Sequence, residues 1–89
     1  MLDYGTADGM RWLSGPDVVQ FIVLDDGQPI TCRVSQRCLE DNCDGSSTAA
    51  GLLGAAKDNF DHITDRVGRL ISLGRFEADG TILLQSSDW

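Results

Sequence analysis

The sequence predicts an α+β fold, in which an antiparallel sheet led by a β-hairpin packs on one short and one long amphipathic helix. Three observations predict it. Two β-rich runs flank an Asp-Gly turn, apolar residues then recur every three to four positions, and a β-rich run follows near the end. Because 89 residues leave room for a single core, we expect one domain over residues 1–89.

The predicted hairpin joins residues 18–24 to residues 29–34 through a turn at Asp26-Gly27. Asp-Gly is typical of a two-residue type I′ turn, because both central residues need positive φ. The turn places Asp25 opposite Gln28 and so fixes the pairing of the two strands. That pairing gathers six apolar residues on one face: Val19, Phe21, Val23, Ile30, Cys32 and Val34.

The opposite face of the hairpin carries Val18, Ile22 and Leu24, and is more apolar than a solvated face needs to be. Exposed apolar patches on small domains often mark interfaces. If the chain folds back, Trp12 joins this patch, so the predicted interface comprises Val18, Ile22, Leu24 and Trp12. The alternative is that residues 1–13 cover the same face within one chain.

Shorter elements flank the hairpin. Residues 10–13 read as a short strand ended by a turn at 14–17, and residues 1–9 are expected to be flexible. After the hairpin, Ser35 is a natural N-cap for a short helix through about Cys43. A loop is expected at residues 44–47.

A long amphipathic helix is predicted from near Ser47 or Thr48 to Gly74, which is a natural C′ residue. Gly51 and Gly54 each cost about 1 kcal/mol relative to Ala, so its first turns should be its weakest part. After a turn at residues 79–80, residues 81–85 read as the last strand. The apolar stripe of the helix is formed by Leu52, Leu53, Ala56, Phe60, Ile63, Val67, Leu70 and Ile71.

Charge limits the classes of partner. Fourteen Asp and Glu stand against seven Lys and Arg, for a net charge of −7, which disfavours direct contact with nucleic acid or an anionic membrane surface. Asp58, Asp61 and Asp65 lie on the predicted outer face of the long helix, where Asp65 can pair with Arg69. We expect this face to contribute mainly to solubility, and only secondarily to offer a docking face for a basic partner.

Composition and cysteine usage favour a cytoplasmic protein. An apolar fraction of 42% is too high for a disordered chain, and no apolar run approaches the roughly 20 residues of a membrane span. Residues 1–9 contain no Lys or Arg, and no apolar signal-peptide region follows them. Three cysteines cannot form a complete set of intramolecular disulfides, which favours a reducing compartment.

The residues that could carry chemistry are few. Cys32, Cys38, Cys43 and the single histidine, His62, could in principle form a Cys3His zinc site, but Cys32 is predicted in the core and His62 facing solvent. Asp58 precedes His62 by four residues and could orient its ring. No nucleophile elbow or phosphate-binding glycine loop accompanies them. We therefore expect no metal, no cofactor and no catalytic residue.

Two segments resemble a bacterial family of small proteins known as domain of unknown function 1488. They are residues 26–35 with residues 38–41, and the closing residues 79–88. The resemblance implies a small α+β domain with an antiparallel sheet on helices, no established catalytic residue, and a loosely suggested regulatory role. The sequence departs from similar proteins at Gly51 and Gly54, where better helix formers are usual.

Together these features predict a small acidic cytoplasmic protein of unknown function. It would act as a non-enzymatic protein-interaction or regulatory module, through a protein partner or self-association. The alternative is a small enzyme or ligand-binding domain that uses His62 with a nearby acid or thiol.

Overall fold

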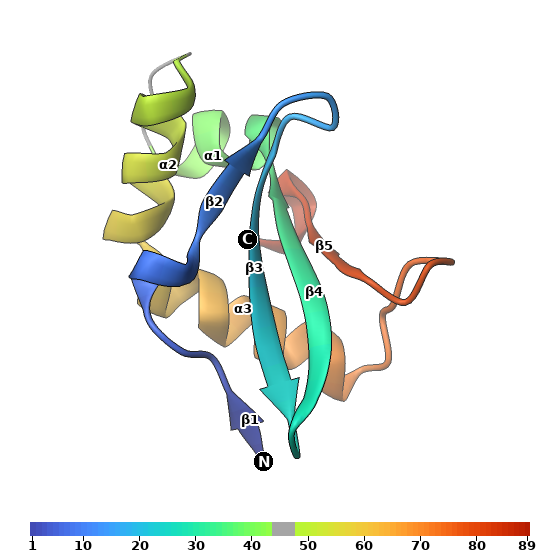
Figure 1. The fold of residues 1–89 in the computed structure, drawn as a ribbon. Helices are drawn as coiled ribbons and strands as arrows, with labels where there is room; N and C mark the ends of the chain where they lie inside the picture. Colours follow the sequence, from blue (N-terminus) through green and yellow to red (C-terminus); the bar gives the residue numbers. More distant parts are fainter. Residues whose placement is uncertain (44–47) are drawn as a thin grey trace.

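A computed structural model describes residues 1–43 and 48–89, and the predicted loop at 44–47 lies outside them. In this described part, five strands form one sheet in the order β1-β3-β4-β5, and β2 also pairs with β3 (Figure 1). The elements follow the chain as β1 (Leu2–Asp3), a 3-10 helix η1 (Ala7–Gly9), β2 (Arg11–Leu13), β3 (Val18–Asp25), β4 (Gln28–Ser35), α1 (Gln36–Asn42), α2 (Ala49–Asp58), α3 (Phe60–Ser72), β5 (Ile82–Leu84) and a second 3-10 helix η2 (Ser86–Asp88).

The hairpin of β3 and β4 confirms the predicted turn and register. Asp26 and Gly27 both have positive φ, at 50° and 85°, as a type I′ turn requires. Asp25 lies opposite Gln28 and Phe21 opposite Cys32. The sheet departs from a purely antiparallel arrangement at one place, since β5 pairs parallel to β4. Parallel strands need a long crossover, and here the three α-helices of the described residues lie between the two strands in sequence.

The helices cover one face of the sheet, and α3 crosses behind β3 and β4 in Figure 1. This face holds the predicted apolar side of the hairpin, together with two residues of β5. Helix residues complete the same hydrophobic cluster. Its members include Val19, Phe21, Val23, Cys32, Val34, Ile82 and Leu84 of the sheet, and Leu39, Leu52, Ala56, Ile63 and Val67 of the helices.

The prediction of one continuous long helix is wrong. The segment forms two helices, α2 and α3, which are divided at Asn59. Asn59 leaves helical geometry (φ −110°, ψ 21°), and its side-chain amide donates to the Ala55 carbonyl at 2.9 Å. An Asn side chain that bonds the backbone competes with helix propagation, so the chain turns here. Each helix then buries its own apolar residues on the same sheet face.

The predicted helix ends are confirmed. The Ser35 hydroxyl accepts from the Cys38 N–H at 3.1 Å, and the Thr48 hydroxyl accepts from the Gly51 N–H at 3.1 Å. At the other end Gly74 has φ +69°, and the Arg75 N–H donates to the Leu70 carbonyl in a Schellman arrangement. Within the described ranges, no helix combines the length and apolar character needed to cross a bilayer.

The first residues lie beside the sheet edge. β1 and β2 both pair with β3 on the edge opposite β4, and η1 lies between them in sequence. Tyr4 follows β1 and packs over Gly68 of α3, where an added methyl group would overlap the tyrosine hydroxyl. This close approach explains a glycine in the middle of α3. The flexibility expected of residues 1–9 stays a prediction.

Candidate functional site

The sheet face opposite the helices is left uncovered by the residues that the structure describes, and we call it the open face. Alternate residues of a strand point to opposite faces, and residues paired across strands share a face. Ile22 and Leu24 on this face are 45% and 38% exposed, whereas the neighbouring Val23 on the helical face is fully buried. From the register, the open face comprises Asp3, Arg11, Leu13, Val18, Gln20, Ile22, Leu24, Pro29, Thr31, Arg33 and Leu83.

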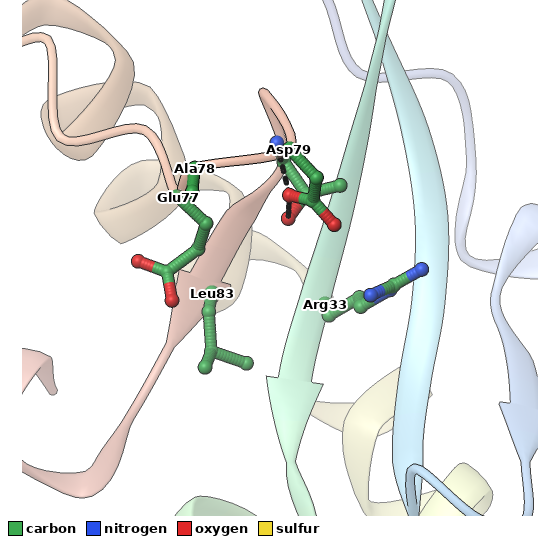
Figure 2. Close-up of a pocket in the computed structure, with 6 residues that line it drawn as sticks. Arg33, Glu77, Ala78, Asp79 and Leu83 are labelled. Atoms are coloured by element: carbon green, nitrogen blue, oxygen red, sulfur yellow. Dashed lines mark hydrogen bonds between the residues drawn. The ribbon is translucent and has the colours of Figure 1, made fainter.

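Two arginines cross this face in one row. Pairing places Arg11 of β2 beside Gln20 of β3, Gln20 beside Arg33 of β4, and Arg33 beside Leu83 of β5. The Arg33 Nε donates to the Gln20 side-chain oxygen at 3.0 Å. Figure 2 shows Arg33 directed toward β3, away from Glu77 and Leu83. This hydrogen bond uses one of the five N–H groups of the guanidinium and holds the Arg33 side chain beside Gln20.

A shallow hollow of about 340 Å³ lies where β4 meets β5. On its rim, the Asp79 carboxylate accepts from the Thr81 hydroxyl at 2.7 Å and from the Thr81 N–H at 3.1 Å (Figure 2). These bonds, and more weakly the charge of Arg33, hold the pKa of Asp79 below its ordinary value. The carboxylate therefore stays ionised. The hollow is lined by Arg33, Glu77, Ala78, Asp79, Thr81 and Leu83.

A second hollow of about 200 Å³ lies near the other edge, lined by Asp3, Gly5, Ile22 and Leu24. The open face therefore has an apolar centre, a row of two arginines, and carboxylates near both edges. Neither hollow is lined by a cysteine or a histidine of the described ranges. Such a surface is suited to contact, because it combines apolar area with charges of both signs.

Three of the four predicted interface residues lie on the open face, and one does not. Ile22 and Leu24 are exposed there, whereas Val18 lies on the same face with only 5% exposure. Trp12 pairs with Val19 and packs against the core, so it belongs to the helical face and does not join the patch. A one-residue shift in strand position reverses the facing of a side chain, which the sequence did not resolve for so short a strand.

The strand register also shows whether residues 1–13 cover this face. The alternative to an interface was that residues 1–13 cover this face within one chain. Instead β1 and β2 lie alongside β3 as edge strands, and Ile22 stays exposed between their pairing sites. In Figure 1 this segment runs along the sheet edge rather than across its surface.

His62 was predicted to face solvent, and it is in fact partly buried. Its ring stacks on Trp89, with ring centroids 4.1 Å apart and planes inclined by 31°, and its Nε2 is buried with no hydrogen-bond partner among the described residues. Asp58 was expected to orient the His62 ring from one turn earlier in the same helix. Asp58 instead ends α2, and His62 lies in α3, so the two residues do not share a helix. In the same described part, no ion pair joins them, and none joins Asp65 to Arg69.

The cysteines are placed as core thiols. Burial raises the pKa of Cys32 to about 12 and that of Cys38 to about 11, so both stay protonated at neutral pH. Cys43 is partly buried at the end of α1. Within residues 1–43 and 48–89, no three His, Cys, Asp or Glu side chains are grouped as metal ligands would be.

The fold defines a small α+β protein with a mixed five-stranded sheet and helices on one face. The sequence pattern of the family described as "Protein of unknown function (DUF1488)" matches residues 8–84, and the chain belongs to this family. No curated protein matches the chain. A crystal structure of a DUF1488-family protein of unknown function from Shewanella loihica PV-4 has the same fold, with a TM-score of 0.79, 20% identity and 84% of each chain covered.

The sequence did not predict that Asp3, Arg11, Leu13 and Leu83 belong to the open face. The places of Gln20, Thr31 and Arg33 on this face follow from the predicted hairpin, because the turn fixes their register. The missed residues come from strands of two or three residues, in which an alternating pattern cannot be recognised.

Proposed function

We propose that the protein is a non-enzymatic protein-interaction module, and that a second copy of this chain packs on its open face. The exposure of Ile22 and Leu24 carries the proposal. These apolar side chains lie at the centre of a sheet face that none of the described helices covers, whereas the other sheet face carries the hydrophobic core. Burying them would be favourable at roughly 25 cal/mol for each Å² removed from water.

The size of the face fits a small interface. Four strand positions at about 4.8 Å spacing and eight residues at about 3.3 Å give a face of roughly 500 Å². Two such faces bury about 1,000 Å² in total, which is at the low end of specific interfaces. We therefore expect weak, concentration-dependent association rather than an obligate dimer.

The charges of the face favour a second copy over a strongly charged partner. Arg11 and Arg33 lie on the same surface as Asp3, and Asp79 lies on its rim. A face with both signs of charge can complement itself, and two-fold dimers are the commonest closed assembly of identical chains. It does not offer the continuous basic surface that nucleic acid requires.

Replacing Ile22 with Asp tests the proposal. Sedimentation equilibrium from low-micromolar to submillimolar concentration should show association of the wild type and a monomeric Ile22→Asp variant. Leu73→Asp is the matched control, because Leu73 is 61% exposed but lies at the end of α3, off the open face. A wild type that stays monomeric throughout, or a Leu73→Asp variant that dissociates equally, would overturn the proposal.

A further inference from the structure

We infer that the two copies are related by a two-fold axis that runs across the strands, along the row of Ile22 and Thr31, so that Asp3 of each copy faces Arg11 of the other. This inference rests on the proposed self-association and names the residues that select its geometry. It follows from the positions of β1 and β2 on the same edge of β3.

Asp3 and Arg11 are placed symmetrically about Ile22. Asp3 pairs with Leu24, two residues after Ile22, and Arg11 pairs with Gln20, two residues before it. Both side chains therefore point to the open face, in the same column. Four residues along β3 separate their positions by about 13 Å.

A two-fold axis across the strands exchanges the two halves of this column. It keeps each strand position in its column and moves a residue above the axis to the same distance below it. Asp3 then lies over Arg11 of the other copy, and Arg11 over Asp3 of the other copy. Ile22 meets Ile22, and the apolar Leu24 lies over Gln20. The roughly 30° crossing angle of aligned sheets is small enough for the long arginine side chain to span.

An axis parallel to the strands is less favourable on charge. It packs each row against the same row of the other copy. The row of Arg11 and Arg33 would then meet two more arginines, with no carboxylate in that row. Asp3 would meet the row of Leu24 and Pro29, which holds no cation. Like charges brought together in an interface are costly, so this arrangement is disfavoured.

Both side chains are available for a contact between copies. Arg11 is exposed, and neither it nor Asp3 takes part in an ion pair among the described residues. One Asp3 oxygen accepts the Gly5 N–H at 3.0 Å, which fixes the carboxylate and leaves its second oxygen open. A fixed carboxylate loses less conformational entropy when a guanidinium binds it.

Two single charge reversals and their mixture test the geometry. Asp3→Arg alone puts two cations at each contact, and Arg11→Asp alone puts two carboxylates there, so each should weaken self-association roughly tenfold. Mixed in equal amounts, the variants should form a heterodimer about as tight as the wild type. The reason is that both arginines of the Asp3→Arg chain then face the two carboxylates of the Arg11→Asp chain. The measurement is sedimentation equilibrium on each variant and on the mixture.

The control is Arg37→Asp, which makes the same charge change on α1, away from the open face. Its self-association should match the wild type. The inference is overturned if the mixture is no tighter than either variant alone, or if Arg37→Asp weakens association as much as Arg11→Asp. If the mixture is no tighter than either variant while Ile22→Asp still dissociates the dimer in the same assay, the proposed self-association stands and only this arrangement fails.

Discussion

The two faces of this sheet are made by the same strands, but helices cover only one of them. On β3, Val19, Phe21 and Val23 are buried beneath the helices, whereas Ile22 and Leu24, in alternation with them, are exposed. Both sets are apolar, so hydrophobicity alone does not decide burial. What differs is that the three described α-helices follow β4 and pack on one side. An apolar face that its own chain leaves open is a candidate for an intermolecular contact.

The sharpest test of this contrast places one substitution on each face. Ile82 of β5 is fully buried on the helical face, while Ile22 is 45% exposed on the open face. We expect Ile82→Ala to lower the free energy of unfolding by about 2–4 kcal/mol, through lost burial and a residual cavity. Ile22→Ala should change it by less than about 0.5 kcal/mol in the monomer.

Urea denaturation at low protein concentration measures both values, since association would otherwise stabilise the native state. Equal losses at the two positions would contradict the contrast between the faces. A small loss at Ile82 would mean that β5 contributes little to the core.

The second prediction concerns the contact between Tyr4, which follows β1, and Gly68 of α3. In Gly68→Ala the new methyl group meets the Tyr4 hydroxyl, and overpacking of this kind costs about 1–3 kcal/mol. Because Ala has a higher helix propensity than Gly, the substitution also stabilises α3 by about 1 kcal/mol. We expect a net loss of about 1 kcal/mol, because Tyr4 must move off α3.

The sign of this effect should reverse when the tyrosine is absent. In a Tyr4→Ala background, Gly68→Ala should stabilise the protein by about 1 kcal/mol, since only the helix preference remains. Thermal or urea unfolding of the four proteins gives the double-mutant cycle. The same loss in both backgrounds would show that the Tyr4 contact is not the reason for the glycine.

The third prediction uses the thiols of the covered face. Cys32 and Cys38 have pKa values of about 12 and about 11, raised by burial above the ordinary 9.0. In the unfolded chain both thiols ionise near pH 9, while in the folded chain they stay neutral. Their contribution is therefore complete below about pH 9 and is lost as the pH rises through the folded values.

Urea unfolding at a series of pH values should show stability falling above about pH 9. A Cys32→Val, Cys38→Ala variant should show a shallower decline over the same range, because these thiols no longer titrate. A decline unchanged by the double substitution would assign it to other groups.

How far the sequence could predict this molecule depends on the range of each interaction. The turn at Asp26-Gly27, the Ser35 cap and the Gly74 helix end are local, and all three are confirmed. The division at Asn59 was missed because the apolar stripe continues through it, and one capping side chain outweighs that pattern. The parallel pairing of β5 depends on contacts distant in sequence, which no local pattern encodes.

The candidate site could likewise be predicted from the sequence only where local interactions determine it. Ile22 and Leu24 could be placed because they lie in the hairpin, whose turn fixes which side chains share a face. Asp3 and Arg11 could not, since their position depends on two edge strands too short to show alternation. The contact of His62 with Trp89 joins α3 to the last described residue, and the spacing of neither residue predicts it.

The smallest expected effect lies at the edge of the open face, at Asp79. The Thr81 hydroxyl is the first cause of its lowered pKa, followed by the Thr81 N–H. Thr81→Val removes the hydroxyl and keeps the N–H and the side-chain shape, so the pKa should rise toward the ordinary 3.8 without reaching it. A depressed folded pKa stabilises the protein above the unfolded pKa, and this contribution is lost as the pH falls through the folded value. The pH window therefore lies below about 4.

Carbon-detected NMR titration of the Asp79 carboxyl measures the shift directly, with Thr31→Val, on the neighbouring strand, as the control. An Asp79 pKa that does not move would show that the backbone N–H and the charge of Arg33 are sufficient to lower it.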